Sequence, residues 1–257
     1  MSNRSDTLAA WIRQRVMEAG ARGLVVGLSG GIDSAVVVRL CQVAMPDHVL
    51  GVIMPCHSDP RDEADAGLVA DHFGVPTIRV DLAPAFDRLI TDLGGALADV
   101  QAPQAVPGPD DTADPRSRMP VANVKPRLRM TSVYFLANSL NYLVVGTGNR
   151  SELTSGYFTK HGDGGVDLLP IGRLLKTEVL DLARELGVPA PVIEKPPSAG
   201  LWAGQTDEGE MGFTYADLEN YLTTGPSTVA PAMALRIERL VRASEHKRAL
   251  PPMPDDD

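Results

Sequence analysis

Four short apolar runs, each separated from the next by a turn and a helix-like stretch, constrain the fold of this chain more than any other feature. They lie at Gly23 to Ser29, His48 to Pro55, Pro76 to Leu82 and Asn141 to Thr147. The runs are continuous rather than alternating, which is typical of strands that are buried on both faces. Because helical stretches separate them, the pattern predicts an α/β fold with a parallel, doubly wound sheet and flanking helices.

Two segments interrupt this alternation. Val100 to Pro120 is rich in proline and aspartate and poor in large apolar residues, so we expect a long, flexible insertion loop there. Pro189 to Gly212 combines proline, glycine and charge around Trp202, and we expect a mobile substrate loop. The tail after Pro251 ends in aspartates and is expected to fray.

Length and composition exclude several classes of protein. With 257 residues, 44% of them hydrophobic, the chain can bury the core of one generous domain. No stretch approaches the roughly 20 apolar residues of a membrane helix. The net charge of −9 disfavours nucleic-acid binding, and two cysteines, Cys41 and Cys56, do not suit a disulfide scaffold or a cysteine-based zinc site. We expect a cytoplasmic protein with no membrane or nucleic-acid partner.

The turn after the first apolar run points to a nucleotide. Ser29-Gly-Gly-Ile-Asp-Ser34 stands between a predicted buried strand and a helix, where backbone N–H groups bind anions. Gly30 and Gly31 allow close approach of the backbone, and the serines add hydroxyl donors. Asp33 would repel a phosphate unless a cation lay between them, so it indicates a bridging magnesium ion. The alternative is a tight strand-to-helix turn with a helix cap.

Two common nucleotide motifs do not match. No lysine follows the glycines as it does in the mononucleotide P-loop, and Gly146-Thr147-Gly148 begins a dinucleotide fingerprint that Ser151 breaks at its third glycine. The hexapeptide instead resembles the SGGxDS signature of the N-type ATP pyrophosphatases. That resemblance implies cleavage of ATP to AMP and pyrophosphate, usually to adenylate a carbonyl oxygen.

Further motifs follow in the order found in ammonia-dependent NAD synthetases. They resemble N-x-K-x-R-x-R-M, G-T-x-N-x-x-E, the loop G-x-x-T-K-x-G-D-G-x-x-D-x-x-P and a closing H-K-R. In this chain they stand at Asn123 to Met130, Gly146 to Glu152, Gly156 to Pro170 and His246 to Arg248. Together with the first turn they cover most of the chain, which therefore resembles this family.

The resemblance implies a ligase of NAD biosynthesis with a Rossmann-like fold of the adenine nucleotide alpha hydrolase type. Such enzymes use ATP to adenylate deamido-NAD, and ammonia then displaces AMP to give NAD. Glutamine-dependent relatives carry an amidohydrolase domain ahead of the synthetase part, for which the segment before Ser29 leaves no room. We therefore expect one synthetase domain over residues 1–257 without a glutaminase domain, and a homodimer with the dinucleotide site at its interface. The nitrogen source is then free ammonia or ammonia from a separate protein.

The same resemblance implies roles for particular residues. Those implied to bind ATP are Gly27, Leu28, Ser29, Gly30, Gly31, Ile32, Asp33, Ser34, Thr147, Lys176 and Ser198. Those implied to contact deamido-NAD are Arg127, Lys160, Asp167, His246 and Lys247. The expected magnesium ligands are Asp33 and Glu152, and the candidate catalytic residues are Asp33, Lys176 and Asp163.

Simpler alternatives exist for these residues. Thr147 and Glu152 follow the fourth run, which in a parallel sheet ends at the same edge as Asp33, but an acid placed like Glu152 is more commonly a helix cap. Asp163 could take the proton from ammonium, or it could bond to its own backbone in a glycine turn. The basic residues are scattered in sequence, and each alone is most often a solvated charge. They suit a pyrophosphate and a carboxylate only if the fold gathers them.

Some positions depart from the family pattern. Some members place an arginine just after the second strand to contact ATP, but this chain has Ile53-Met54-Pro55 there. We expect that contact to be lost or supplied by another residue such as Arg61. Lys195 to Ser198 and Asp207 to Tyr215 resemble the family's mobile loop, which would keep water from an acyl-adenylate. Cys56 follows the second run without partners for a nucleophile, so we expect a small buried residue.

Rival functions remain open at this point. The chain could be another N-type ATP pyrophosphatase, such as a GMP-synthase-like amidating subunit or a tRNA-modifying adenylator. It could also be a non-catalytic ATP-binding module. The net charge of −9 disfavours tRNA. The joint presence of Asp33, Glu152 and Lys176 favours catalysis, because binding alone does not need that set.

Overall fold

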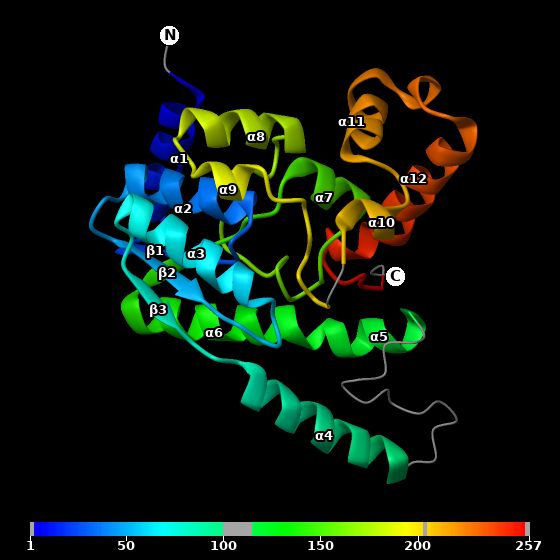
Figure 1. Cartoon of the computed structure of the whole chain (residues 1–257), viewed down its shortest axis with the longest axis horizontal. Coiled ribbons are helices and arrows are strands. Elements are labelled where there is room, and N and C mark those ends of the chain that lie inside the picture. Colours follow the sequence, from blue (N-terminus) through cyan, green and yellow to red (C-terminus); the bar gives the residue numbers. More distant parts are fainter. Residues whose placement is uncertain (1–2, 100–114, 203–204, 255–257) are drawn as a thin grey trace.

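The computed structural model describes residues 3–99, 115–202 and 205–254. Its four strands form a fully parallel sheet in the order β3-β2-β1-β4. The strands are β1 (Gly23–Leu28), β2 (Val49–Ile53), β3 (Thr77–Arg79) and β4 (Tyr142–Val145). Each lies inside one of the four apolar runs, so the predicted α/β class is confirmed (Figure 1).

Helices cover both faces of the sheet (Figure 1). Successive residues of β1 show why: Leu24 and Val26 pack into one core, and Val25 between them packs into the other. The first core is closed by α1 (Arg4–Glu18), α2 (Ile32–Ala44), α3 (Pro60–Phe73), α8 (Lys176–Glu185) and α9 (Ala190–Ile193). The second is closed by α4 (Ala83–Asp99) and α6 (Val124–Leu140).

The C-terminal part forms a smaller helical cluster beside the carboxyl edge of the sheet (Figure 1). Phe213, Leu218 and Ile237 belong to its core, which is separate from the two sheet cores. Its helices are α10 (Asp207–Met211), α11 (Tyr215–Thr224) and α12 (Pro231–Ala243), with the short turns η1 (Pro226–Thr228) and η2 (Glu245–Lys247). Two further helices, α5 (Pro115–Ala122) and α7 (Arg150–Ser155), precede α6 and follow β4 respectively.

Three expectations need correction. The third run is not buried on both faces, because β3 is an edge strand with Thr77 and Arg79 exposed. The expected insertion loop is wrong for 115–120, since α5 begins at Pro115, where the missing proline N–H is harmless in a first helical turn. Residues 100–114 lie outside the described part. The expected loop from Pro189 to Gly212 contains α9 and α10. None of the described helices is long and apolar enough to cross a membrane.

Candidate active site

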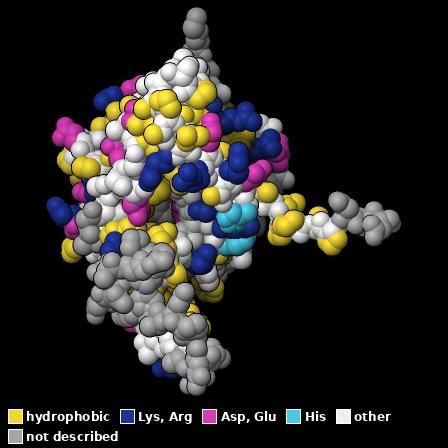
Figure 2. Space-filling view, turned by 90° about the vertical axis from the view of Figure 1, so that its right-hand side faces the viewer, with side chains coloured by type: hydrophobic (Ala, Val, Ile, Leu, Met, Phe, Trp, Pro, Cys, Tyr) yellow, Lys and Arg dark blue, Asp and Glu magenta, His cyan; other side chains and the backbone are white. Residues whose placement is uncertain are grey.

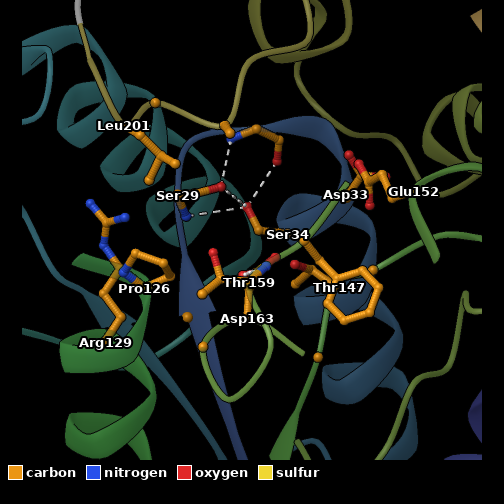
Figure 3. Close-up of a pocket in the computed structure, with 18 of the residues that line it drawn as sticks. Ser29, Asp33, Ser34, Pro126, Arg129, Thr147, Glu152, Thr159, Asp163 and Leu201 are labelled. Atoms are coloured by element: carbon orange, nitrogen blue, oxygen red, sulfur yellow. Dashed lines mark hydrogen bonds between the residues drawn. The ribbon is translucent and has the colours of Figure 1, made fainter. Parts of the chain in front are cut away.

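A cavity of about 580 Å³ opens at the carboxyl edge of the sheet, beside the turns that follow β1, β2 and β4. Ligands of open α/β sheets usually bind at this edge. Most of the predicted ATP-binding residues line the cavity: Gly27, Leu28, Ser29, Gly31, Ile32, Asp33, Ser34, Thr147 and Ser198. Figure 3 labels Ser29, Asp33, Ser34 and Thr147 among them. Gly30 and Lys176 are not among the lining residues.

The turn after β1 is held in shape by its own hydroxyl groups. Ser29 Oγ donates to Ser34 Oγ at 3.1 Å, and Ser34 Oγ donates to the Gly31 carbonyl at 2.8 Å (Figure 3). Gly30 has a φ of 75°, and a Cβ there would lie 2.3 Å from the Asp62 carbonyl oxygen of α3. Only glycine fits that position, so the turn is packed directly against the first turns of α3.

An ion cluster lies at the start of α2. Lys176 Nζ at the start of α8 is 2.5 Å from Asp33 Oδ2 and 3.8 Å from Glu152 Oε1 of α7. Asn149 Nδ2 donates to Asp33 Oδ1 at 2.9 Å. Burial alone would lower the pKa of Lys176, but the two carboxylates raise it above its ordinary value. The lysine is therefore held charged between the two acids.

Glu152 caps α7 and also approaches Lys176. Its Oε2 accepts from Asn149 N at 3.1 Å, and Asn149 Oδ1 accepts from Glu152 N at 3.0 Å, which completes a capping box on α7. Its Oε1 faces Lys176. Burial and the nearby Asp33 carboxylate raise the pKa of Glu152. The cap and the ionic role are not alternatives, because each uses a different carboxylate oxygen.

The donor set fits a magnesium ion that arrives with a nucleotide. No three His, Cys, Asp or Glu side chains gather closely enough to hold a metal within the described ranges. Magnesium is usually held by one or two carboxylates together with substrate phosphates, so a complete protein cage is not needed. Asp33 and Glu152 already share one cation, the ammonium of Lys176.

Four of the five residues predicted to contact deamido-NAD line the cavity, and the structure brings them together from distant parts of the chain. They are Arg127, Lys160, His246 and Lys247. Lys160 Nζ donates to the His246 carbonyl at 2.6 Å. Figure 2 shows Lys and Arg side chains gathered near histidines on one face of the molecule.

The fifth residue, Asp167, lies elsewhere and does not line the cavity. Its Oδ2 accepts from Val144 N at 2.8 Å, and its Oδ1 accepts from the Tyr134 hydroxyl at 2.9 Å. Within one copy of the chain, Asp167 therefore joins β4 to α6 and does not reach the cavity.

The closing H-K-R segment is tied to the loop that holds Asp163. Lys247 Nζ donates to the Gly156 carbonyl at 2.7 Å and to the Phe158 carbonyl at 2.6 Å, and burial lowers the pKa of Lys247. Asp163 lines the cavity, and its Oδ1 accepts from Thr159 N at 2.8 Å. The turn-stabilising role of Asp163 is thus present, and burial raises its pKa.

Arg61 does not replace the arginine that is absent after β2. Its side chain is 86% exposed and pairs with Asp59 outside the cavity. Arg129 of α6 reaches the end of β2 instead, donating to the Met54 carbonyl at 3.2 Å and to Ser58 Oγ at 3.1 Å. The second arginine of the N-x-K-x-R-x-R-M motif was the only sequence signal for this residue. Cys56, expected to be a small buried residue, is fully buried.

The pairing of other charged groups near the cavity had no sequence signal. The Lys176 ammonium lies 5.3 Å from the centre of the Tyr215 ring, whose hydroxyl donates to Asp207 Oδ2 at 2.8 Å. Lys195 pairs with Asp62 and Asp65 of α3. These partners are far apart in sequence, so no local spacing could connect them.

Known proteins that resemble this chain over nearly its full length are NAD synthetases and an NMN synthetase. The family model described as NAD synthase matches residues 5–251. The NH(3)-dependent NAD(+) synthetase of Carboxydothermus hydrogenoformans is 49% identical over 251 residues, covering 98% of this chain and 96% of that protein. The solved structure of NMN synthetase from Francisella tularensis has a TM-score of 0.83 at 34% identity, covering 98% of each chain. NAD+ synthetase from Burkholderia pseudomallei has a TM-score of 0.76 at 31% identity, covering 96% of this chain and 90% of that one.

Proposed function

This chain belongs to the NAD synthase family, and on that premise we propose that it makes NAD from deamido-NAD, ATP and ammonia. It is a ligase that forms a carbon–nitrogen bond. The observation that carries the proposal is the meeting of the anion-binding turn of β1 with Asp33, Lys176 and Glu152 at one edge of the sheet. A module that only bound ATP would not need two acids and a lysine at that point.

The reaction has two chemical steps. A carboxylate oxygen of the nicotinate ring attacks the α-phosphorus of ATP, and the bond from that phosphorus to the bridging oxygen breaks as pyrophosphate leaves. Ammonia then attacks the carbonyl carbon of the acyl-adenylate and, after losing a proton, replaces AMP. The product is NAD, the amide of deamido-NAD, and one AMP and one pyrophosphate form for each NAD.

The turn after β1 and Lys176 bind and align the triphosphate. Backbone N–H groups at a helix start donate hydrogen bonds to phosphate oxygens, and the hydroxyl contacts of Ser29 and Ser34 hold those groups in place before ATP binds. When ATP binds, the ammonium of Lys176 exchanges its contact with Asp33 for contacts with the phosphates. A preformed turn of this kind costs little reorganisation in the reaction.

Asp33 and Glu152 would hold a magnesium ion together with the phosphates. When bound, that ion supplies neutralisation of the charge that develops on the departing pyrophosphate. Both acids lie at the cavity and already share a cation, which supports this assignment.

Asp163 receives the proton of ammonium in this proposal. Ammonia is mostly protonated at neutral pH and becomes a nucleophile only after deprotonation. A carboxylate that lines the cavity and whose pKa is raised by desolvation is suited to that transfer. Asp163 keeps its bond to Thr159 N through Oδ1, which leaves Oδ2 for the cation.

The protein acts as a homodimer through α4, α5 and α6. Among the described residues, half of the twelve exposed large hydrophobic side chains lie on these helices: Leu89, Leu93, Leu97, Met119, Phe135 and Leu140. Three of the leucines form a stripe at i, i+4 and i+8 on α4, which lies at the outer side of α6 in Figure 1. A second copy that presents the same stripe would cover it by twofold symmetry. The partner's Asp167 could then complete the dinucleotide site.

The remaining expectations stay predictions. One synthetase domain over residues 1–257 and a cytoplasmic location agree with the composition. The dinucleotide is favoured over a mononucleotide substrate because the relatives called NAD synthetases reach 49% identity, against 34% for the NMN synthetase. Both substrates carry the same nicotinate carboxylate, so the assay must separate them.

The test is an incubation of the purified protein with ATP, magnesium, ammonium chloride and deamido-NAD, in which NAD and AMP are followed together. We expect equal amounts of both products, and neither without all four components. Nicotinate mononucleotide and xanthosine monophosphate replace deamido-NAD in parallel incubations. If either compound is turned over faster than deamido-NAD, that compound is the substrate. ATP binding with no AMP in any incubation would contradict catalysis.

A further inference from the structure

Lys195 connects the segment that follows α9 to the first turns of α3. Its Nζ lies 2.8 Å from Asp62 Oδ1 and 2.5 Å from Asp65 Oδ2. All three side chains are only about a quarter exposed, so the contact is partly shielded from water. Burial would lower the pKa of Lys195, but its hydrogen bonds to the two acids raise it. One ammonium thus bridges two carboxylates through charge-assisted hydrogen bonds, which distinguishes this contact from an ordinary surface ion pair.

The same segment is anchored at its other end by α6. The buried Lys125 donates from Nζ to the Leu201 carbonyl at 2.7 Å. Residues 195–201, called the strap below, therefore run from α3 to α6 along the cavity, which every one of them lines. Figure 3 places Leu201 across the cavity from Asp33 and Glu152. Ser198, one of the predicted ATP contacts, lies in the middle of the strap.

The acids that hold Lys195 are also the acids packed on the phosphate-binding turn. A Cβ on Gly30 would lie 2.3 Å from the Asp62 carbonyl oxygen and 2.9 Å from Asp65 Cβ. A Cβ on Gly200 of the strap would lie 3.4 Å from Asp62 Oδ2. The same two residues thus pack against the turn expected to bind the triphosphate, through the Asp62 backbone and the Asp65 Cβ, and hold the strap through their carboxylates.

We propose that Lys195 is a positioning residue that couples closure of the strap to ATP binding by compensating one of the two negative charges of Asp62 and Asp65. With Lys195 docked, one of the two negative charges beside the phosphate turn is compensated and the strap lies over the nucleotide. With Lys195 released, two carboxylates face an incoming triphosphate without compensation, and the strap no longer limits the entry of water. The inference rests on the proposed function, because it concerns the fate of an acyl-adenylate.

Lys195 contributes a positive charge and an anchor for the strap, and the loss of each has a measurable consequence. Loss of the lysine charge weakens ATP binding through like-charge repulsion, which raises the KM for ATP by about tenfold, as expected for a charge-assisted contact. Loss of the anchor admits water to the acyl-adenylate, so more than one AMP forms for each NAD. A structural defect alone would lower kcat without changing that ratio.

The experiment compares Lys195→Met, Lys195→Arg, Asp62→Asn/Asp65→Asn and the triple variant Lys195→Met/Asp62→Asn/Asp65→Asn. Each is assayed for the KM for ATP and for the AMP-to-NAD ratio. Lys195→Met is expected to raise both quantities, and Lys195→Arg to keep both near the wild-type values. The triple variant should recover the KM for ATP, because no unpaired acid remains, yet keep the raised AMP-to-NAD ratio, because the strap has no anchor.

A matched control is Arg184→Met, which removes a cation paired with Asp181 at 2.9 Å on the exposed face of α8. It should leave both quantities unchanged. The inference is overturned if Lys195→Met keeps a ratio of one with an unchanged KM for ATP, or if the triple variant binds ATP no better than Lys195→Met. Failure of the wild-type protein itself to make NAD from deamido-NAD would instead overturn the proposed function.

Discussion

The ammonium of Lys176 lies 2.5 Å from the carboxylate of Asp33, although the two residues are 143 positions apart in the chain. Both side chains are largely buried, with 12% and 16% of their surfaces exposed. Two acids that are largely buried side by side are stable only while a cation lies between them, and here the ammonium of Lys176 is that cation. The lysine therefore marks a place where these two acids need a positive charge beside them.

We predict that Lys176→Met destabilises the protein by about 3 kcal/mol, because Asp33 and Glu152 then face each other without a cation. Magnesium in millimolar excess should restore part of that loss, since it can take the place of the ammonium. Urea unfolding with and without magnesium, in the absence of ATP, measures the effect. Equal responses of the wild type and the variant to magnesium would contradict the assignment of these acids as metal ligands.

Glu152→Gln separates the two uses of that side chain. Glutamine can still accept from Asn149 N, so the cap on α7 and the stability should be retained. The lost negative charge should raise the magnesium concentration for half-maximal pyrophosphate release at least about tenfold. A variant that unfolds much more easily, with an unchanged magnesium requirement, would show that the cap is the main role.

Gly30→Ala tests the close approach between the phosphate-binding turn and α3. The new Cβ would meet the Asp62 carbonyl at 2.3 Å at a φ of 75°, so we expect a loss of at least about 2 kcal/mol of stability together with ATP binding. Gly67→Ala is the control within α3, because no atom lies within 4 Å of its Cβ position. It should stabilise the helix by up to about 1 kcal/mol. Thermal unfolding and ATP titration follow both variants.

The stability of the protein should carry a pH dependence from Asp163. Desolvation raises its folded pKa above the ordinary 3.8 in spite of the hydrogen bond from Thr159 N and the positive charges of Lys247 and Arg129. The folded state therefore holds the proton more tightly than the unfolded state. The free energy of unfolding therefore decreases as the pH rises from the unfolded pKa to the folded pKa of Asp163. Above the folded pKa, Asp163 is ionised in both states and the whole decrease persists.

Asp163→Asn removes this titration but keeps an oxygen that accepts from Thr159 N. Relative to the wild type, the variant should gain stability between acidic and neutral pH, as measured by urea unfolding at several pH values. A stability difference that stays constant with pH would be the contrary result. If Asp163 also receives the ammonium proton, the same variant loses NAD formation while it still forms AMP.

The proposed dimer can be tested on the exposed stripe of α4. Leu93→Glu combined with Phe135→Glu places charge on side chains that are 46% and 70% exposed in the single chain. We expect a stable monomer with much weaker binding of deamido-NAD, as followed by sedimentation and substrate titration. Leu235→Glu on α12, whose residue is 62% exposed, is the control and should not change the oligomeric state.

Sequence patterns predicted the fold class, and most of the predicted site residues line the cavity, because both depend on local features. The continuous apolar runs at β1, β2 and β4 encode buried parallel strands, and parallel strands bring their carboxyl ends to one edge. The turn after β1 and the segment after β4 therefore had to meet. The motif around Asn149 and Glu152 placed the second acid, although its geometry also made it a cap.

Only the tertiary structure decided which charged groups pair across that edge. Lys195 and Asp62 are 133 residues apart, and Lys125 and Leu201 are 76 apart, so no period or spacing connects them. It also showed that Arg129, rather than Arg61, reaches the end of β2, and that Asp167 points away from the cavity of its own chain. The physical reason is that backbone propensity and hydrophobic period act over a few residues. Pairing of charges depends on distances that exist only after the sheet and its two helical layers have assembled.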